Sequence, residues 1–358
     1  MKRNVTMQDV ADSAGVSKAS VSNLFNYPDR LRAEVRTRIE EAVHRLGYAG
    51  PDPKARLLNS GKVNMIGWVP SGDYGICSAF VIHSTLLLHG VAEVCDENGC
   101  GLSLISGMGE ARSAGISNAL VDGFILGNLD DVNFLEIGKR RSLPMVLLDQ
   151  TGDDSVGSVS VDDQDGARIM TQHLLDLGHR RFAVMTHTRL DDGRPEVFHP
   201  GAGRHRALLP ALPSLPKRLQ GVADALKSAG LSIDDMPLVE GNGRMGPGWT
   251  GGTVDAAKSV LDNAPEATAI IALTDGFALA ILTEAKQRGI SIPDDLSVVG
   301  FGNLPLAALA EPPLSSISHD AEEKGRIAAR MLFDSAPPRQ VILPVELVVR
   351  SSTAPPRT

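Results

Sequence analysis

Residues 5–26 constrain the fold more than any other stretch, because they read VTMQDVADSAGVSKASVSNLFN. Thr6, followed three residues later by Asp9, is a capping-box pattern, which predicts a helix that begins after Thr6. Gly15 allows a sharp turn, and Ser17 can cap a second helix. The stretch therefore predicts two short helices joined by a tight turn, which is the helix-turn-helix pattern of DNA-binding heads. A small helical subdomain with a capped surface helix is the alternative interpretation.

The second helix carries the residues expected to meet DNA. Its apolar residues Ala19, Val21 and Leu24 are expected to face the first helix. Its outward side chains are short or polar, which suits contact with base edges and phosphates: Lys18, Ser20, Ser22 and Asn23. The residues near its N-terminus, Lys18, Ala19 and Ser20, are expected to reach base edges in the major groove, Ala19 through apolar contact alone.

A third amphipathic helix is predicted over Arg36–Leu46 and ends at Gly47. Leu-Gly-Tyr follows at 46–48 and PDPKARLLNSGK at 51–62. Together with DVADSAGVSKASVS at 9–22, these blocks resemble the lac repressor (LacI/GalR) family. There are two departures from the family pattern: an extra residue before Pro51, and Arg32 where the family usually has a serine cap.

The resemblance implies a set of DNA contacts and a hinge. A hinge helix over 53–59 is too short to be stable alone and is expected to form when two copies pair on DNA. Leu58 is then expected to wedge into the minor groove, or else to be buried against its own domain. The implied DNA-binding residues are Thr6, Ser17, Lys18, Ala19, Ser20, Ser22, Asn23, Asn26, Tyr48, Ala55 and Leu58.

Length, charge and cysteines agree with a regulator that has a separate sensory domain. The 358 residues suffice for more than one domain, and no apolar run is long enough to span a membrane. Residues 1–62 hold eleven Lys and Arg against seven Asp and Glu, a net of +4, which leaves −12 for the rest of a chain whose total is −8. A basic head on an acidic body is typical of a DNA reader, although ordinary charge scatter gives the same numbers. The N-terminus has no apolar signal region, and the three cysteines have no metal-ligand spacing, so a reduced cytoplasmic setting is expected.

From residue 64 onward, short apolar runs alternate with helical stretches, which predicts parallel sheets with helices on both faces. One such series ends near Asp162 and a second begins. The resemblance extends over this region and implies an α/β, periplasmic-binding-protein-like core of two doubly wound subdomains, crossed near Asp162, near 315–319 and near Gln340. The expected domains are a head at 1–50, a hinge at 51–62, an N-terminal subdomain at 63–161 and 319–338, and a C-terminal subdomain at 162–318 and 339–351.

Candidate effector residues lie where strands end. Trp249, in the loop GPGWTGG, can stack on a sugar or a base, or pack on its own domain. Arg218 opens R-L-x-G at the start of a predicted helix and offers forked donors, or is a solvated arginine. Asp149, Thr274 and Asp275 end or follow strands, and Asp275 can also cap a helix.

At Gly302 and Asn303 the chain departs from the family's usual paired aspartates, which leaves Asn303 as the polar group and argues against a standard hexose. The stretch 188–217 breaks the strand–helix rhythm and is predicted to be a long loop, either a surface insertion or a lid.

The sequence therefore predicts a DNA-binding transcriptional regulator, usually a repressor, whose affinity for a pseudo-palindromic operator depends on a small molecule such as a sugar or polyol. A homodimer is expected from the operator symmetry. No metal or cofactor site and no catalytic arrangement is expected. A solute-binding protein and an α/β enzyme that uses the same crevice are the alternatives.

Overall fold

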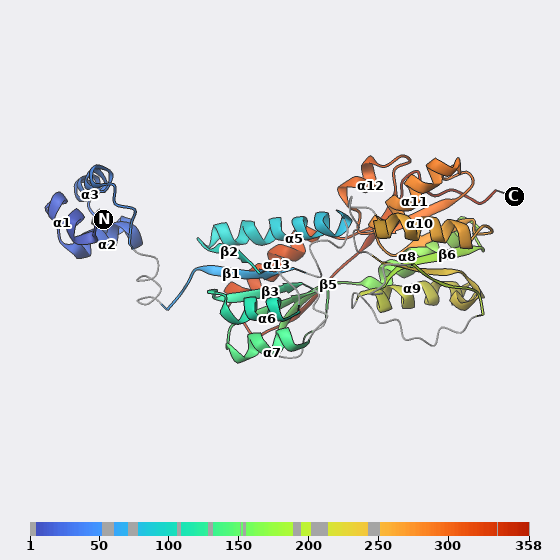
Figure 1. Ribbon diagram of the computed structural model, residues 1–358, viewed down its shortest axis with the longest axis horizontal. Helices are drawn as coiled ribbons and strands as arrows, with labels where there is room; N and C mark the ends of the chain where they lie inside the picture. The colour runs from blue at the N-terminus through green and yellow to red at the C-terminus, as the bar shows by residue number, and fades with distance from the viewer. Residues whose placement is uncertain are drawn as a thin grey trace. The chain divides into compact units, whose positions relative to one another are not determined.

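The computed structural model describes residues 5–51, 61–70, 78–105, 109–127, 132–150, 152, 155–188, 195–201, 214–242, 251–334 and 336–357. The chain divides into two compact units, Met1–Val63 and Asn64–Thr358 (Figure 1). Within the described residues, no helix combines the length and the apolar character needed to cross a membrane.

The first unit is a small helical domain whose local signals behave as predicted. It contains α1 (Met7–Ala14), α2 (Lys18–Asn26), the 3-10 turn η1 (Pro28–Arg30) and α3 (Ala33–Leu46). Thr6 and Asp9 form the capping box, and Gly15 ends α1 at φ 64°, in the left-handed region that favours glycine. Ser17 caps α2 by accepting a hydrogen bond from the Ser20 backbone N–H at 3.1 Å. The helix-turn-helix prediction is therefore confirmed in its caps and its turn.

Packing in this unit corrects two details. Val21 is buried, whereas Ala19 is exposed and does not face α1 as predicted. Helix α3 begins at Ala33, three residues before the predicted start, and its N-cap residue Arg32 makes no side-chain capping hydrogen bond. Its buried positions are Ile39 and Ala42, with partly buried residues around them. The buried core of the head thus consists of Ala and Val side chains around Ile39, with larger, partly buried residues packed against it.

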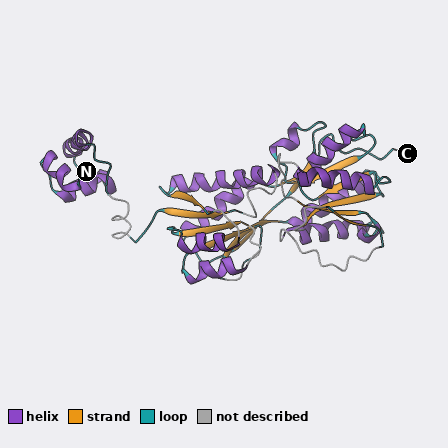
Figure 2. Ribbon diagram, viewed as in Figure 1, coloured by secondary structure: helices purple, strands orange, loops and turns teal. Residues whose placement is uncertain are grey.

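The second unit contains two sheets, each with helices on both faces (Figure 2). In the first sheet the described strands are all parallel, in the order β12-β5-β4-β3-β1-β2. These strands are β1 (Met65–Val69), β2 (Gly101–Leu104), β3 (Gly123–Gly127), β4 (Met145–Leu148), β5 (Gly157–Val161) and β12 (Gln340–Leu343).

The second sheet has the order β13-β11-β10-β9-β6-β8-β7 and is parallel except at its two edge strands, β13 and β7. Its strands are β6 (Phe182–Thr188), β7 (Glu196–Phe198), β8 (Leu238–Asn242), β9 (Ala269–Ala272), β10 (Ser297–Phe301), β11 (Ser315–Ser318) and β13 (Glu346–Val348). The predicted α/β core of two doubly wound sheets is therefore confirmed.

Buried side chains on the two faces of each sheet form separate cores, as expected when helices cover both faces. On the first sheet, α5 (Ser78–Glu97) and α13 (Ala321–Phe333) cover one face, and α6 (Gly109–Asn118) and α7 (Val132–Arg140) cover the other. On the second sheet, α8 (Asp163–Asp176) and α9 (Ser214–Ser228) lie opposite α10 (Gly251–Asn263) and α11 (Asp275–Arg288). The short helices η2 (Ile233–Asp235) and α12 (Pro305–Leu309) complete the unit.

The chain passes between the two sheets three times, and the last passage differs from the prediction. The first is at Asp162, between β5 and α8, and the second lies between β11 and α13. The third follows Leu343, because all four residues of β12 pair with β5 in the first sheet. Residues 340–343 therefore belong to the first sheet, and the prediction that 339–351 lies in the C-terminal subdomain is wrong for them. The sequence of a short strand with polar neighbours does not indicate which of the two sheets the strand joins.

The stretch 188–217 is also more regular than predicted. Its first residue ends β6, an edge strand β7 pairs antiparallel with β8, and α9 begins at Ser214. Residues 189–194 and 202–213 lie outside the described residues. The prediction of one long loop is therefore wrong for Thr188, for 196–198 and for 214–217.

Candidate DNA-binding surface and effector site

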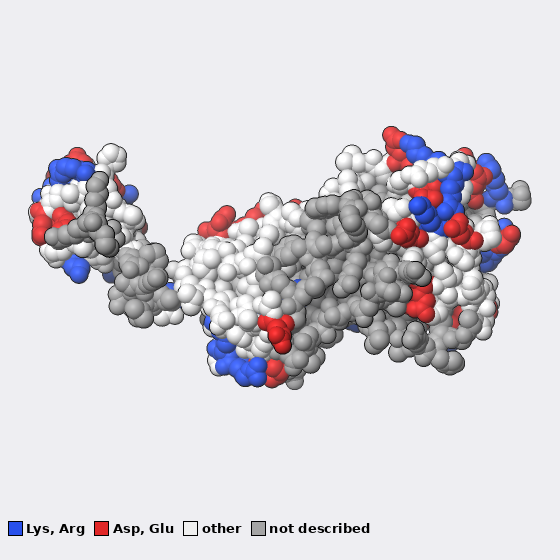
Figure 3. Space-filling model, viewed as in Figure 1, with Lys and Arg blue, Asp and Glu red and all other residues white. Residues whose placement is uncertain are grey.

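The N-terminal half of α2 presents the side chains that a major groove would meet. Ser17, Lys18 and Ala19 are exposed and Ser20 is half-buried, while Val21 in the next position is buried against the core of the head. Because Val21 and the capped turn fix the rotation of α2, these side chains point away from the head's own core. In the view of Figure 3 the described surface of the head carries both Lys or Arg and Asp or Glu. Residues 5–51 hold six of each kind, so the net charge of +4 comes from residues 1–4 and 52–62.

The other predicted DNA-binding residues differ in their environment. Thr6 is exposed in its capping box, whereas Tyr48 is half-buried and packs edge-on against Phe25 with ring centroids 5.9 Å apart. Ser22 and Asn23 are half-buried along α2. The Asn26 side chain, Ala55 and Leu58 lie outside the described residues.

In the second unit, Asp149 follows β4 and lies in a partly buried charged cluster, with its side chain 19% exposed. Its Oδ1 accepts a hydrogen bond from the Lys324 ammonium at 2.6 Å, and its Oδ2 lies 3.8 Å from His83 Nε2. Lys324 is only 1% exposed. Burial by itself raises the pKa of Asp149, but the ammonium and the imidazole more than offset it, so this pKa lies well below its ordinary range. Burial and the neighbouring Lys324 lower the pKa of His83, which keeps the imidazole neutral near pH 7.

Arg218 is held in the second turn of α9 rather than at the helix start. Its Nε donates to Asp163 Oδ1 at 2.7 Å and its Nη1 donates to the Leu273 carbonyl at 2.7 Å. Its guanidinium carbon lies 3.6 Å from the centroid of the Phe301 ring, in cation–π contact. The charge of Arg218 is therefore balanced by Asp163, and its plane is fixed by the carboxylate, the carbonyl and the ring.

Asp275 does not cap α11. Thr274 is the N-cap residue and makes no side-chain cap bond, while the buried Asp275 carboxylate accepts from Ser316 Oγ at 2.5 Å and from the Leu304 backbone N–H at 2.7 Å. Burial raises the pKa of Asp275 to about 6. Both of its oxygens therefore connect α11 to β11 and to the segment after β10, and the capping alternative is wrong.

The local backbone conformation favours glycine at position 302, where the family usually has an aspartate. Gly302 has φ 131°, which strains any L side chain, and a Cβ there would lie 3.5 Å from Asp275 Oδ2. An aspartate at this position would add strain and place a second carboxylate beside a buried one. Asn303 is itself in the left-handed region at φ 44°. Its Oδ1 accepts from Arg350 Nη2 at 2.7 Å and its Nδ2 donates to Ser318 Oγ at 3.1 Å.

Aromatic contacts connect the clusters at the ends of the two sheets. The rings of His83, on α5, and His319, directly after β11, lie edge to face with centroids 5.3 Å apart. His319 also lies 6.4 Å from Phe301, the ring on which Arg218 stacks. Side chains from α5, α13 and the first sheet therefore meet side chains from the second sheet around the carboxyl ends of the strands, where open α/β sheets bind ligands.

Comparison with known proteins agrees with both units. A model for the lacI family of bacterial regulatory proteins matches residues 6–50, and one for a periplasmic binding protein-like domain matches residues 171–353. An HTH-type transcriptional regulator of Mycolicibacterium smegmatis is 33% identical over 371 residues, covering 99% of this chain and 98% of that protein. The chain belongs to the lacI family of bacterial regulatory proteins. The resemblance of the sequence blocks is confirmed.

Two solved structures share the fold of this lacI-family chain. The transcriptional regulator CelR in complex with cellobiose is 25% identical with a TM-score of 0.67, over 98% of this chain and 100% of that one. The lac repressor dimer bound to operator and the anti-inducer ONPF has a TM-score of 0.78 at 23% identity, over 98% and 100% of the two chains. Since its full-length relatives are transcriptional regulators, the chain is a DNA-binding transcriptional regulator rather than an enzyme.

Sequence reasoning missed several buried polar residues of this lacI-family chain. Lys324, His83 and His319 join the cluster around Asp149, and Asp163 pairs with Arg218. Four atoms are shielded from solvent and have no hydrogen-bond partner in the part of the chain that the structure describes: His319 Nδ1, both ring nitrogens of His187, and Thr186 Oγ1. Each is a single residue without a motif, so only the spatial arrangement identifies it. Among the described residues no group of His, Cys, Asp and Glu is arranged to hold a metal ion.

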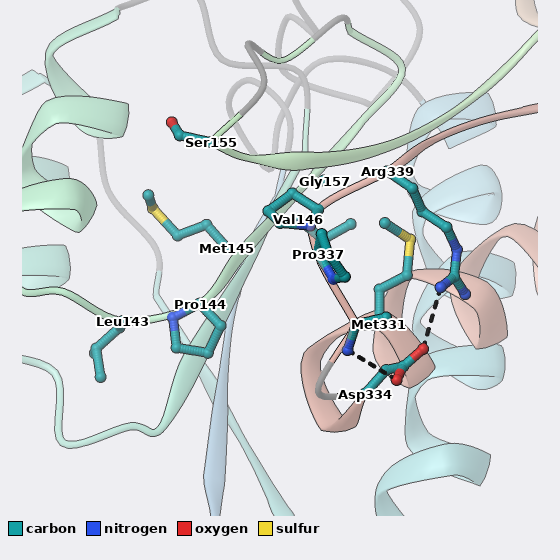
Figure 4. Close-up of a pocket in the computed structure, with 12 residues that line it drawn as sticks. Leu143, Pro144, Met145, Val146, Ser155, Gly157, Met331, Asp334, Pro337 and Arg339 are labelled. Carbon is teal, nitrogen blue, oxygen red and sulfur yellow. Dashed lines mark hydrogen bonds and ion pairs between the residues drawn. The ribbon is translucent and has the colours of Figure 1, made fainter.

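Trp249, a predicted effector residue, lies outside the described residues. A cavity of about 210 Å³ lies at the amino ends of β4 and β5, beside the end of α13 (Figure 4). It is lined mainly by apolar side chains with the Asp334–Arg339 ion pair at 3.1 Å, and it contains none of the predicted effector residues.

Proposed function

We propose that this regulator binds a pseudo-palindromic operator as a homodimer in the cytoplasm, and that an uncharged sugar or polyol, bound between the carboxyl ends of the two sheets, controls its operator affinity. The proposal of DNA binding rests on the exposed N-terminal half of α2, whose orientation is fixed by buried Val21 and the Ser17 cap. Helix N-termini with short polar side chains fit the major groove and its phosphates.

The dimer and the ligand class draw support from relatives. The lac repressor is a dimer on its operator, and CelR was solved with cellobiose. In this chain the charges near the carboxyl ends are paired as Asp149 with Lys324 and Asp163 with Arg218. A site whose charges are already balanced favours a ligand without net charge.

We further propose distinct roles for the candidate residues. Asp149, Arg218 and Trp249 contact the ligand directly. Thr274, Asp275 and Asn303 shape the site, because Asp275 and Asn303 already use their side chains within the protein. Residues 51–62 form the hinge, in which Leu58 and Ala55 reach DNA in the bound dimer.

The test begins by selecting an operator from random duplex DNA with the full-length protein. A pseudo-palindromic site is expected, because two-fold symmetry of the protein is mirrored in its DNA. Leu58→Ala is then expected to weaken binding to that operator far more than binding to random DNA, since a wedge acts on the kinked central step. Binding is followed by fluorescence anisotropy at fixed salt, with and without cellobiose or ribose.

Three results count against this proposal. A selected operator sequence without two-fold symmetry contradicts binding as a homodimer. Equal losses for Leu58→Ala on operator and random DNA contradict the wedge. An operator affinity that no sugar or polyol changes contradicts control by such a ligand.

A further inference from the structure

The buried ammonium of Lys324 has more hydrogen-bond donors than the protein satisfies. It lies in the first turn of α13 with 1% of its surface exposed. An ammonium has three N–H donors. In the described part of the chain, Asp149 Oδ1 is its one hydrogen-bond acceptor, at 2.6 Å. Two donors of a charged and buried group are therefore left for another acceptor.

Unused polar groups gather beside this ammonium. The second carboxylate oxygen, Asp149 Oδ2, is 3.8 Å from His83 Nε2, which is beyond hydrogen-bond length. His319, whose ring lies 5.3 Å from that of His83, has a buried Nδ1 without a hydrogen-bond partner among the described residues. Unpaired buried polar atoms are costly, and native proteins keep few of them. The cluster therefore presents a donor, an acceptor and an imidazole nitrogen to a missing partner.

The chemistry of these groups indicates the class of that partner. A hydroxyl both donates and accepts, so it can accept from the ammonium while it donates to the neighbouring carboxylate or to the imidazole. An ionised phosphate or carboxylate only accepts, so it can take the ammonium donors but has no hydrogen to donate to Asp149 Oδ2 or to the imidazole. A buried ion pair is also a weak source of stability compared with apolar residues, so stability alone gives little reason for this pair.

We propose that Lys324, Asp149 and His319 form a hydroxyl-binding subsite, in which Lys324 selects an uncharged polyhydroxy ligand over a phosphorylated or carboxylated one. This assignment rests on the proposed control by a sugar or polyol and adds to it a specificity residue on α13. The subsite joins α13, the end of the first sheet and the passage after β11, so an occupant contacts the first sheet and the segment that leads to it from the second.

The experiment measures binding of four probes to the full-length protein by calorimetry: cellobiose, ribose, glucose 6-phosphate and ribose 5-phosphate. The wild type is expected to bind at least one of the uncharged sugars and neither phosphate ester. The key variant is Lys324→Met with Asp149→Asn, which removes both charges together and leaves no buried charge unpaired. It is expected to bind the sugar at least ~10-fold more weakly, the equivalent of about 1.4 kcal/mol.

Two further variants keep the test decisive. His319→Phe retains a ring but lacks Nδ1, so it is expected to weaken sugar binding while the protein unfolds cooperatively as before. Lys286→Met removes an exposed lysine of α11, whose partner Glu311 is also exposed, and serves as the matched control with unchanged binding. If the double variant does not fold, the sugar affinity of His319→Phe alone tests the subsite.

The outcomes separate this subsite from the proposed function. Wild-type sugar affinity in the folded double variant overturns the subsite and the direct contact proposed for Asp149, and it leaves control by a sugar intact. Should the double variant not fold, wild-type sugar affinity in His319→Phe overturns the subsite. Preference of the wild type for a phosphate ester overturns the selection by Lys324. Binding of none of the four probes overturns control by these sugars and the subsite with it.

Discussion

At the scale of single residues, Asp275 shows how a polar group at a strand end can serve the protein itself. Its two oxygens accept from Ser316 Oγ and from the Leu304 backbone N–H, and it is 1% exposed. Burial raises its pKa to about 6, above the ordinary value of 3.8. The native state therefore retains a proton that the unfolded chain releases at lower pH. The charged form, present near neutral pH, is the less favourable one in this site.

We predict that Asp275→Asn changes the pH dependence of stability. The raised pKa contributes to the free energy of unfolding, and this contribution is fully present below about pH 4 and is lost as the pH rises through about 6. Asparagine does not titrate, so the free energy of unfolding of the wild type should fall relative to the variant by about 2–3 kcal/mol between pH 4 and pH 7. Urea unfolding of both proteins across this range measures the difference. Parallel profiles would show that Asp275 titrates normally.

At the scale of elements, α5 and α13 approach each other backbone to backbone. A Cβ on Gly325 would lie 2.1 Å from the Leu87 carbonyl oxygen, and one on Gly90 would lie 1.9 Å from the Glu322 carbonyl oxygen. The two glycines thus allow a contact that no side chain fits. Because Lys324 precedes Gly325, the same contact positions the ammonium against Asp149.

We predict that Gly325→Ala destabilises the protein by about 2 kcal/mol or more, although alanine favours an isolated helix by about 1 kcal/mol. The added methyl group meets backbone atoms, which cannot move aside as a flexible side chain does. Denaturant unfolding measures the loss. The control is Arg330→Ala on the same helix, whose half-exposed side chain makes it a change of about 0.5 kcal/mol or less. Equal stability of Gly325→Ala and the control would contradict the close contact.

At the scale of the whole molecule, the two sheets are joined by three chain passages and by side chains that meet at the carboxyl ends. Leu304, after β10, also packs against Ile82 and Leu86 of α5. A ligand among these side chains contacts both sheets at once. The free energy by which the ligand favours one arrangement of the sheets equals the difference between its binding free energies for the two arrangements.

We predict reciprocal coupling between ligand and operator. If a sugar changes the operator dissociation constant by a given factor, the operator must change the sugar dissociation constant by the same factor, typically about 5- to 150-fold in such systems. Both constants are measured on the full-length protein, by anisotropy for DNA and by calorimetry for sugar in the presence of operator. Unequal factors at equilibrium would mean that the ligand acts through another species, such as a change in dimerisation.

The sequence by itself determined the features that depend on near neighbours. The capping box of Thr6 and Asp9, the turn at Gly15 and the cap at Ser17 each involve residues within a few positions of one another. Apolar runs alternating with amphipathic stretches likewise predicted the doubly wound sheets. Family blocks placed these elements in order along nearly the whole chain.

Only the tertiary structure decided which polar groups meet. Lys324 and Asp149 are separated by 175 positions, and neither lies in a motif that indicates the other. Asp275, expected to cap a helix or face a ligand, is instead bonded to β11, and the last passage between the sheets follows β12 rather than preceding it. The physical reason is that burial and hydrogen bonding between distant segments depend on how helices and strands pack against one another. Local propensity does not specify this packing.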